Sequence, residues 1–315
     1  MFDDKNDNTW YDDGEGYSRW DTDNLTALET YGQINTWNVS LINDMSMVFI
    51  NKDSFNDDIG NWDVSNVTNM MGMFYGASSF NQDLFNWDVS SVTDISRMFE
   101  DAENFNGDIS SWDVSNVQNM EMTFRMATAF NQDLSSWNVS NVSNMKLVFE
   151  DASNFEGDIS AWDVSNVSDM YGMFLRATNF NSDISAWDVS NTTNMSHMFL
   201  GCSNFAASLS EWNVSNVSDM SQMFDDATNF NGDILVEVSA SDGQALDNTS
   251  FTLTVNPVND APVLDAIADQ EVDDAAAQDG GHAAGQDGGA PSLAASLAPS
   301  SVPGLAPGGR GHAPL

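Results

Sequence analysis

Tryptophan recurs every 25 residues through the middle of this chain, and no insertion or deletion interrupts the spacing. The eight copies are Trp37, Trp62, Trp87, Trp112, Trp137, Trp162, Trp187 and Trp212. An uninterrupted period of this length is typical of a solenoid, in which each repeat forms one coil and cannot bury its apolar side alone. The spacing therefore predicts a stack of eight coils rather than an ordinary globular core.

Other positions are equally regular when each Trp is numbered position 0 of its coil. Val occupies +2, Ser occupies +3 and Phe occupies +12 and +18 in all eight coils, while +22 is always Ile or Leu. Trp and Val, two residues apart, share one side of an extended chain. We therefore expect a short strand there and a parallel β-sheet with strands about 4.8 Å apart. The apolar spacing from +5 to +12 favours a helical turn or a 3₁₀ segment.

These patterns predict an α/β solenoid with a short parallel sheet on one face. The eight coils are expected to occupy residues 37–233. Residues 1–36 are expected to form an N-terminal cap whose aromatic side chains cover the first coil. Alternation of apolar and polar residues at 234–255 predicts a β-hairpin. This hairpin is expected to cap the array and, together with a short linker stub, to occupy residues 234–264. The tail at 265–315 becomes rich in Ala, Gly, Pro and Ser, and we expect it to be disordered because it has little apolar surface to bury.

The charge balance restricts the partners of the chain. It carries 48 acidic and 8 basic residues, a formal charge of −40, which disfavours nucleic acid and anionic lipid. Its one cysteine, Cys202, permits no intrachain disulfide, and its three histidines argue against a His-based triad or zinc site. No apolar run approaches 18 residues, so membrane insertion is not expected. The sequence also shows no signal peptide or membrane anchor.

Two columns of short polar side chains are expected to point outward from the predicted strands. Position +1 is Asp or Asn, and position +3 is Ser, in every coil. The predicted ligand-binding residues are Asp63, Ser65, Asp88, Ser90, Asp113, Ser115, Asp163 and Asp188. The other interpretation of this surface is a solvated face that keeps the sheet soluble. Carboxylates about 4.8 Å apart repel one another, which predicts a raised mean pKa.

A second polar group lies at positions +19 and +21, where most coils carry Asn and Asp. Short carboxylate and amide side chains commonly accept backbone N–H groups at tight turns. We therefore expect these columns to hold the corners of the coils rather than a ligand.

The repeat resembles the BspA-like leucine-rich repeat of bacterial surface lipoproteins, in its 25/26-residue form. The string WDVSNVTNM at 62–70, with MF at 73–74 and FNQDL at 80–84, carries the resemblance, which covers about 34–234. It implies leucine-rich-repeat-like coils, display at the bacterial cell surface or secretion, and a non-catalytic role in adhesion.

The segment VNDAPVL at 258–264 resembles the junction between bacterial cadherin-like or immunoglobulin-like adhesin modules. In calcium-binding cadherins an acidic linker before Ala-Pro ligates Ca²⁺ between modules. That resemblance implies Asp242 and Asp260 as Ca²⁺ ligands.

The sequence thus predicts an adhesion or recognition solenoid that binds an extracellular protein or glycan through its strand face. Catalysis is not expected, because an active site needs different residues converging in one pocket, whereas here every acidic column repeats unchanged. The alternative is a structural or mineral-interacting acidic surface protein with weak multivalent Ca²⁺ binding. An ice-facing array is a weaker alternative, and no other cofactor is expected.

Overall fold

The computed structural model describes residues 32–241 and 246–254, and it describes side chains over 32–232. The chain divides into two units, Met1–Asp265 and Ala266–Leu315, the second of which lies outside the described residues. Most of the predicted N-terminal cap and the predicted disordered tail also lie outside them. Across the described part of the chain, no helix is long and apolar enough to cross a membrane.

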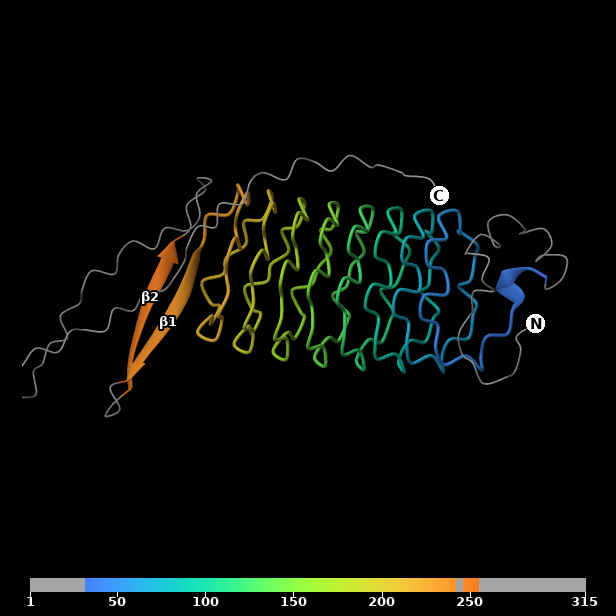
Figure 1. Ribbon diagram of the computed structural model, residues 1–315, viewed down its shortest axis with the longest axis horizontal. Coiled ribbons are helices and arrows are strands. Elements are labelled where there is room, and N and C mark those ends of the chain that lie inside the picture. Colours follow the sequence, from blue (N-terminus) through green and yellow to red (C-terminus); the bar gives the residue numbers. More distant parts are fainter. Residues whose placement is uncertain (1–31, 242–245, 255–315) are drawn as a thin grey trace, which may run out of the picture. The chain divides into compact units, whose positions relative to one another are not determined.

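Regular secondary structure is scarce in the described residues (Figure 1). It consists of the 3₁₀ helix η1 (Ile34–Thr36) and the strands β1 (Asp233–Ser241) and β2 (Leu246–Thr254). The two strands pair antiparallel from Asp233↔Thr254 to Ser241↔Leu246, within the segment for which alternation predicts a hairpin. The remainder is a stack of coils built almost entirely from turns.

Stacked aromatic rings fill the core of the coils, as the repeat predicts. The Phe(+12) and Phe(+18) rings of one coil lie 3.8–4.2 Å apart between centroids. Neighbouring coils place their Phe(+12) rings 5.4–5.7 Å apart, and Trp rings from Trp87 to Trp212 are 6.1–6.5 Å apart. These side chains are buried, so each coil covers the apolar side of the next.

The predicted strand at Trp(0) and Val(+2) is wrong. In the described coils these residues form no strand, and no backbone hydrogen bond joins positions 0 to +3 of neighbouring coils. Parallel pairing occurs instead as one isolated bridge per coil at +7, in the series from Asp44↔Asn69 to Asn194↔Asp219. The alternation rule finds two residues on one side of an extended chain, but it does not identify which segment bonds to its neighbours.

Backbone hydrogen bonds between coils run along positions +8 to +14. In the fourth coil (112–136) the N–H groups of Met120, Met122, Phe124 and Met126 donate to carbonyls of the fifth coil (137–161) over 2.7–3.1 Å. The acceptors lie at +7, +9, +11 and +13 of that next coil. Every second residue of this segment therefore points its N–H group at the following coil.

Consecutive turns make this pattern possible, and they replace the predicted helical or 3₁₀ segment. The N–H of Thr123 donates to the carbonyl of Met120, and the third residue of that turn, Met122, has φ 58°. A positive φ at this place is what a type II turn requires, and it ends any right-handed helix. Positions +10 and +14 have positive φ in all eight coils, and glycine occupies only four of these sixteen positions.

Side chains join the coils on the tryptophan side. Each indole Nε1 from Trp62 to Trp212 donates to the backbone carbonyl 28 residues earlier, over 2.9–3.2 Å. From Trp87 onward this acceptor is position +22 of the coil two before, which directly precedes the neighbouring Trp in the chain. Asn(+4) donates through Nδ2 to the Ser(+3) carbonyl of the preceding coil, as Asn116 does to Ser90 at 2.7 Å. Ile34 in η1 accepts the Trp62 bond, so it takes the +22 place ahead of the first coil.

Candidate functional site

The polar edge, defined as the side chains at +1 and +3, stabilises its own turns. In all eight coils the +1 Oδ1 accepts the backbone N–H of the +3 serine, over 3.0–3.2 Å. The predicted site residues Asp63, Asp88, Asp113, Asp163 and Asp188 are exposed. Their serine neighbours, Ser65, Ser90 and Ser115, are partly buried. These carboxylates therefore have a structural role, while a role in ligand binding stays a prediction.

The expectation of a raised pKa along this edge is wrong at three of its aspartates. Hydrogen bonds from the hydroxyl and then the N–H of the following serine lower the pKa of Asp63, Asp113 and Asp188. Direct hydrogen bonds to the charged form thus outweigh the repulsion between neighbouring coils.

The second polar group holds coil corners, as predicted. The Oδ1 of Asp133 accepts the Ser135 N–H at 2.8 Å, and Asp108, Asp158 and Asp183 make the same bond. Asn(+19) reaches the next coil: the Oδ1 of Asn106 accepts the Asn131 N–H at 2.8 Å.

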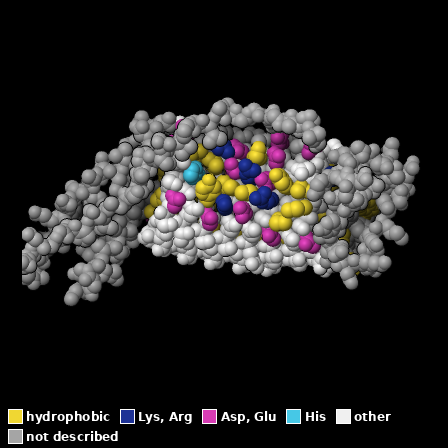
Figure 2. All heavy atoms as spheres, in the orientation of Figure 1, with side chains coloured by type: hydrophobic (Ala, Val, Ile, Leu, Met, Phe, Trp, Pro, Cys, Tyr) yellow, Lys and Arg dark blue, Asp and Glu magenta, His cyan; other side chains and the backbone are white. Residues whose placement is uncertain are grey.

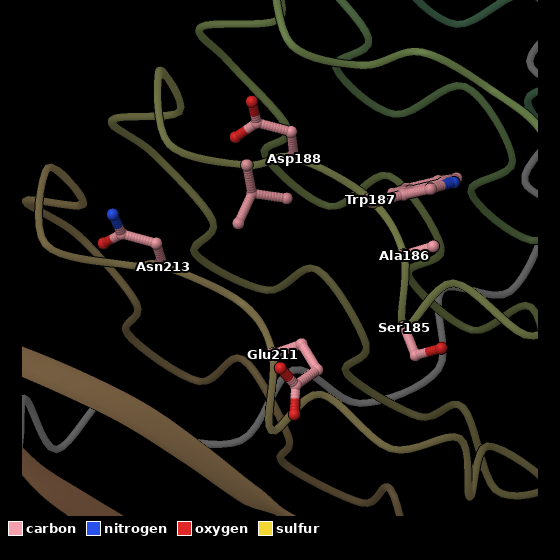
Figure 3. Close-up of a pocket in the computed structure, with 7 residues that line it drawn as sticks. Ser185, Ala186, Trp187, Asp188, Glu211 and Asn213 are labelled. Atoms are coloured by element: carbon pink, nitrogen blue, oxygen red, sulfur yellow. The ribbon is translucent and has the colours of Figure 1, made fainter.

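A depression of about 420 Å³ lies on the polar edge between the seventh and eighth coils. It includes the predicted site residue Asp188, beside Asn213 and Glu211. Figure 3 shows that these three side chains lie apart from one another rather than converging on one point. The indole of Trp187, which forms part of the wall, is almost fully buried. The arrangement presents no pair of groups poised for acid–base or nucleophilic chemistry.

Calcium binding gains no geometric support from the described residues. Within 32–241 and 246–254, no three His, Cys, Asp or Glu side chains lie where they could hold one metal ion. The predicted Ca²⁺ ligands Asp242 and Asp260 lie outside the described residues.

A different surface carries the variation of the repeat, and the sequence reasoning missed it. We define the variable face as the side chains at +9, +10, +13 and +14, which flank the invariant buried Phe(+12). Its bulky members are Met47, Ile50, Met71, Tyr75, Arg97, Glu100, Glu121, Met122, Arg125, Met126, Lys146, Leu147, Glu150, Tyr171, Leu175, Arg176, His197 and Leu200. The sequence does carry a signal for this face. The two positions before Met-Phe (+9 and +10) and the two positions after it (+13 and +14) differ from coil to coil.

Figure 2 shows charged and hydrophobic side chains gathered in one band along the coils, beside a band of other polar side chains. In the described residues, four of the five Lys and Arg lie on the variable face, and the fifth, Lys52, follows it at +15. In the coils that span 87–186, the variable face holds four basic and five acidic residues. The other positions of these coils hold eleven acidic residues and no basic one. The variable face is therefore close to neutral on a strongly acidic molecule.

An ion-pair network crosses four coils of this face. Arg97 pairs with Glu100 at 3.2 Å, and Glu100 pairs with Arg125 of the next coil at 2.8 Å. Arg125 also pairs with Glu150 at 2.6 Å, and Glu150 pairs with Arg176 at 2.9 Å. The side chains of Glu100 and Glu150 are 2% and 8% exposed, so these carboxylates are buried only because arginines pair with them.

The pKa values of two arginines reflect this network. Partial burial lowers the pKa of Arg125, but the hydrogen bonds that it donates to Glu150 and Glu100 outweigh burial and raise that pKa above its usual value. The hydrogen bonds of Arg176 to Asp151, at 2.7 Å, raise its pKa. Both guanidinium groups therefore stay charged at any ordinary pH.

Aromatic and apolar groups adjoin these charges. The Lys146 ammonium lies 5.5 Å from the centre of the Tyr171 ring, and Tyr171 lies 5.3 Å from His197. The Nδ1 atom of His197 is buried and has no hydrogen-bond partner in the described residues. Met, Tyr and Arg together are the residue types enriched at protein interfaces.

The backbone under this face is unusual as well. Residues of the face such as Arg97, Met122, Leu147 and His197 have φ between 56° and 60°. Non-glycine residues rarely adopt this conformation, and where they do they cluster at functional sites. The conformation persists here because both the turns and the hydrogen bonds between coils depend on it.

Comparison with known proteins places the repeats in a family. A family model described as "Mycoplasma protein of unknown function, DUF285" matches residues 23–137 and 119–237, which together cover about two-thirds of the chain. No curated protein and no solved structure matches the chain.

Proposed function

The chain belongs to the DUF285 family of Mycoplasma proteins, whose description assigns no activity, and we propose that it is a non-catalytic recognition protein. Its binding surface is the variable face, and its partner is a macromolecule. The observation that carries this proposal is the contrast between an invariant scaffold and one variable, near-neutral face that contains Met, Tyr and Arg.

Each constant or nearly constant position has a structural reason, which supports this division. Trp, Asn(+4), the +1 acceptors and Asn(+19) all bond to the backbone, and Phe and Val fill the core. The positions that vary have no such shared bond. A repeat protein that recognises a ligand needs this arrangement, because its scaffold must stay constant while its contacts differ from coil to coil.

We further propose that the protein acts at the cell surface or is secreted, as an adhesion protein related to the BspA-like leucine-rich-repeat proteins. The motif at 62–70 supports that relationship. The cadherin-like likeness at 258–264 supports the same setting, although that segment lies outside the described residues.

The test compares two variants of the full chain on an array of extracellular-matrix proteins and glycans. The face variant carries Met122→Glu and Tyr171→Ala, and the edge variant carries Asp88→Asn and Asp113→Asn. We expect wild type and the edge variant to bind the same array members and the face variant to lose them. If the edge variant loses binding while the face variant keeps it, the polar edge is the binding surface. Near-ultraviolet circular dichroism of the stacked tryptophans checks that each variant remains folded.

A further inference from the structure

We propose that the variable face takes a second copy of this chain, packed antiparallel about a two-fold axis between the fourth and fifth coils. The inference rests on the proposed function, because it concerns the same face, which a second copy and an array ligand would occupy in turn. Such an axis lies in the interface and crosses the array at right angles. It reverses the order of the coils and keeps the position within each coil. A residue at +9 of the fourth coil therefore faces +9 of the partner's fifth coil.

Opposite charges meet in this arrangement. At +9, Glu121 of the fourth coil faces Lys146 of the second copy, and the same pair forms again across the axis. One coil further out, at +14, Asp101 lies across from a residue of the opposite sign, Arg176. No charged residue of the face meets a like charge. At the centre of the interface, at +10, Met122 lies across from Leu147, of which 7% is exposed, and this juxtaposition also occurs twice.

Side-chain sizes also match across the axis. His197 faces Gly72, so a bulky side chain meets a glycine. Tyr171 faces a serine, Ser96. Alternation of large and small groups lets two faces interdigitate, which good packing at an interface requires.

The register is specified by repulsion as well as attraction. Sliding the partner by one coil in one direction places Arg125 against Arg125 and Glu121 against Glu121. Sliding it in the other direction places Lys146 against Lys146. Both neighbouring registers thus juxtapose like charges, which is how specific interfaces exclude incorrect pairings.

The acidic surroundings make a second copy a better partner than an acidic or a basic macromolecule. An acidic ligand would be repelled by the rest of the surface, and a basic ligand would be attracted more strongly to the polar edge, where no basic residue offsets the aspartates. The charge of −40 on each copy opposes association at long range. We therefore expect the dimer to be tighter at about 0.15 M salt, where charges are screened beyond about 8 Å, than at about 0.01 M.

Sedimentation equilibrium of the full chain tests the proposal through two single variants. Glu121→Lys places lysine against Lys146 of its partner, and Lys146→Glu places glutamate against Glu121. Each variant alone should associate at least about tenfold more weakly than wild type, because like charges meet twice. An equimolar mixture of the two should dimerise again with nearly wild-type affinity, because opposite charges then face each other at both places. Phe85→Ser is the control, since Phe85 is 50% exposed at +23, away from the variable face, and should change nothing.

The mixture distinguishes a direct Glu121–Lys146 contact between two copies from a general effect of charge or of folding. The Glu121–Lys146 contact within one chain is long, at 3.9 Å, so neither variant should unfold the coils, and circular dichroism checks this. A wild-type chain that remains monomeric at millimolar concentration would overturn the inference. So would a mixture that stays as weak as the two single variants. Either result leaves the proposed function intact if the face variant still loses array binding. Loss of array binding by the edge variant alone would contradict the proposed function instead.

Discussion

The indole Nε1 of Trp137 donates a 3.2 Å hydrogen bond to the backbone carbonyl of Ile109, at position +22 of the third coil (87–111). The same side chain is 2% exposed and stacks between Trp112 and Trp162, at 6.1 and 6.5 Å. Tryptophan is therefore the one residue that fills the core at position 0 and also satisfies a buried carbonyl. This double role explains why the residue is the same in all eight coils.

Substitution at Trp137 should separate these two roles. Trp137→Ala removes the ring and the donor, and we expect it to lower the free energy of unfolding by about 3–5 kcal/mol. Trp137→Phe keeps an aromatic ring but removes one of the two hydrogen bonds that the Ile109 carbonyl accepts, the other coming from the Trp112 N–H, which should cost about 1 kcal/mol. Denaturant unfolding followed by circular dichroism measures both values. A Trp137→Phe variant as stable as wild type would show that the hydrogen bond contributes nothing.

The positive φ at +10 predicts that glycine stabilises this position, although glycine within regular structure is usually destabilising. Gln222 is exposed and has φ 54°. Gln222→Gly should raise the free energy of unfolding by about 0.5–1 kcal/mol, because glycine adopts this conformation without steric strain. Gln222→Val should lower it by about 1 kcal/mol or more, since a β-branched side chain tolerates positive φ poorly. Thermal unfolding of the three chains tests the order, and a valine variant as stable as wild type would refute the backbone assignment.

Close contact between coils explains a glycine at +20. A β-carbon added to Gly107 would overlap the backbone carbonyl oxygen of Gln82 in the preceding coil. Gly107→Ala should therefore lower the free energy of unfolding by about 1–3 kcal/mol, because a coil must shift to admit the methyl group. Asp57→Ala at the same position of the first coil, where the side chain is exposed, is the matched control. It should change stability little, since a β-carbon is already present there.

Acid should weaken the polar edge. The folded pKa of Asp113 is lowered by its bonds from Ser115, so the stabilisation it provides is present above its unfolded pKa, about 3.9. That stabilisation is lost as the pH falls through the folded pKa. The free-energy difference between wild type and Asp113→Asn should be constant above about pH 5 and shrink below about pH 4. Unfolding titrations at several pH values measure it. A difference that instead moves in favour of wild type in acid would mean that repulsion between coils dominates.

The repeat made part of this structure predictable. The 25-residue period, the buried rings at 0, +12 and +18, and the corner role of Asp(+21) all follow from residues that recur. The hydrogen-bonded segment did not follow, because Met, Met and Phe at +8, +11 and +12 fit a helical turn as well as they fit consecutive type II turns. Gly72 and Gly76 indicate positive φ at +10 and +14 of their coil. Most coils carry residues other than glycine at these two positions, so the repeat as a whole does not predict positive φ there.

The candidate site was harder to predict for a related reason. Columns of identical Asp and Ser attract attention, yet they are constant because each bonds to its own turn. A binding surface in a repeat protein is found where residues differ between coils. Lys146 and Tyr171 both occupy +9, and only their positions in the folded chain reveal that they share a face with Arg125.

The variable face exists as described only if the coils bond to one another through positions +8 to +14, and amide hydrogen exchange tests this directly. The N–H groups of Met122 and Phe124 donate to the next coil, each at 2.9 Å, whereas those of Asp113 and Val114 have no acceptor in the described residues. We predict slow exchange at Met122 and Phe124 and exchange at least about tenfold faster at Asp113. Protection of Asp113 and Val114, with rapid exchange at Met122 and Phe124, would instead place the sheet on the tryptophan side and contradict both the fold and the proposed binding surface.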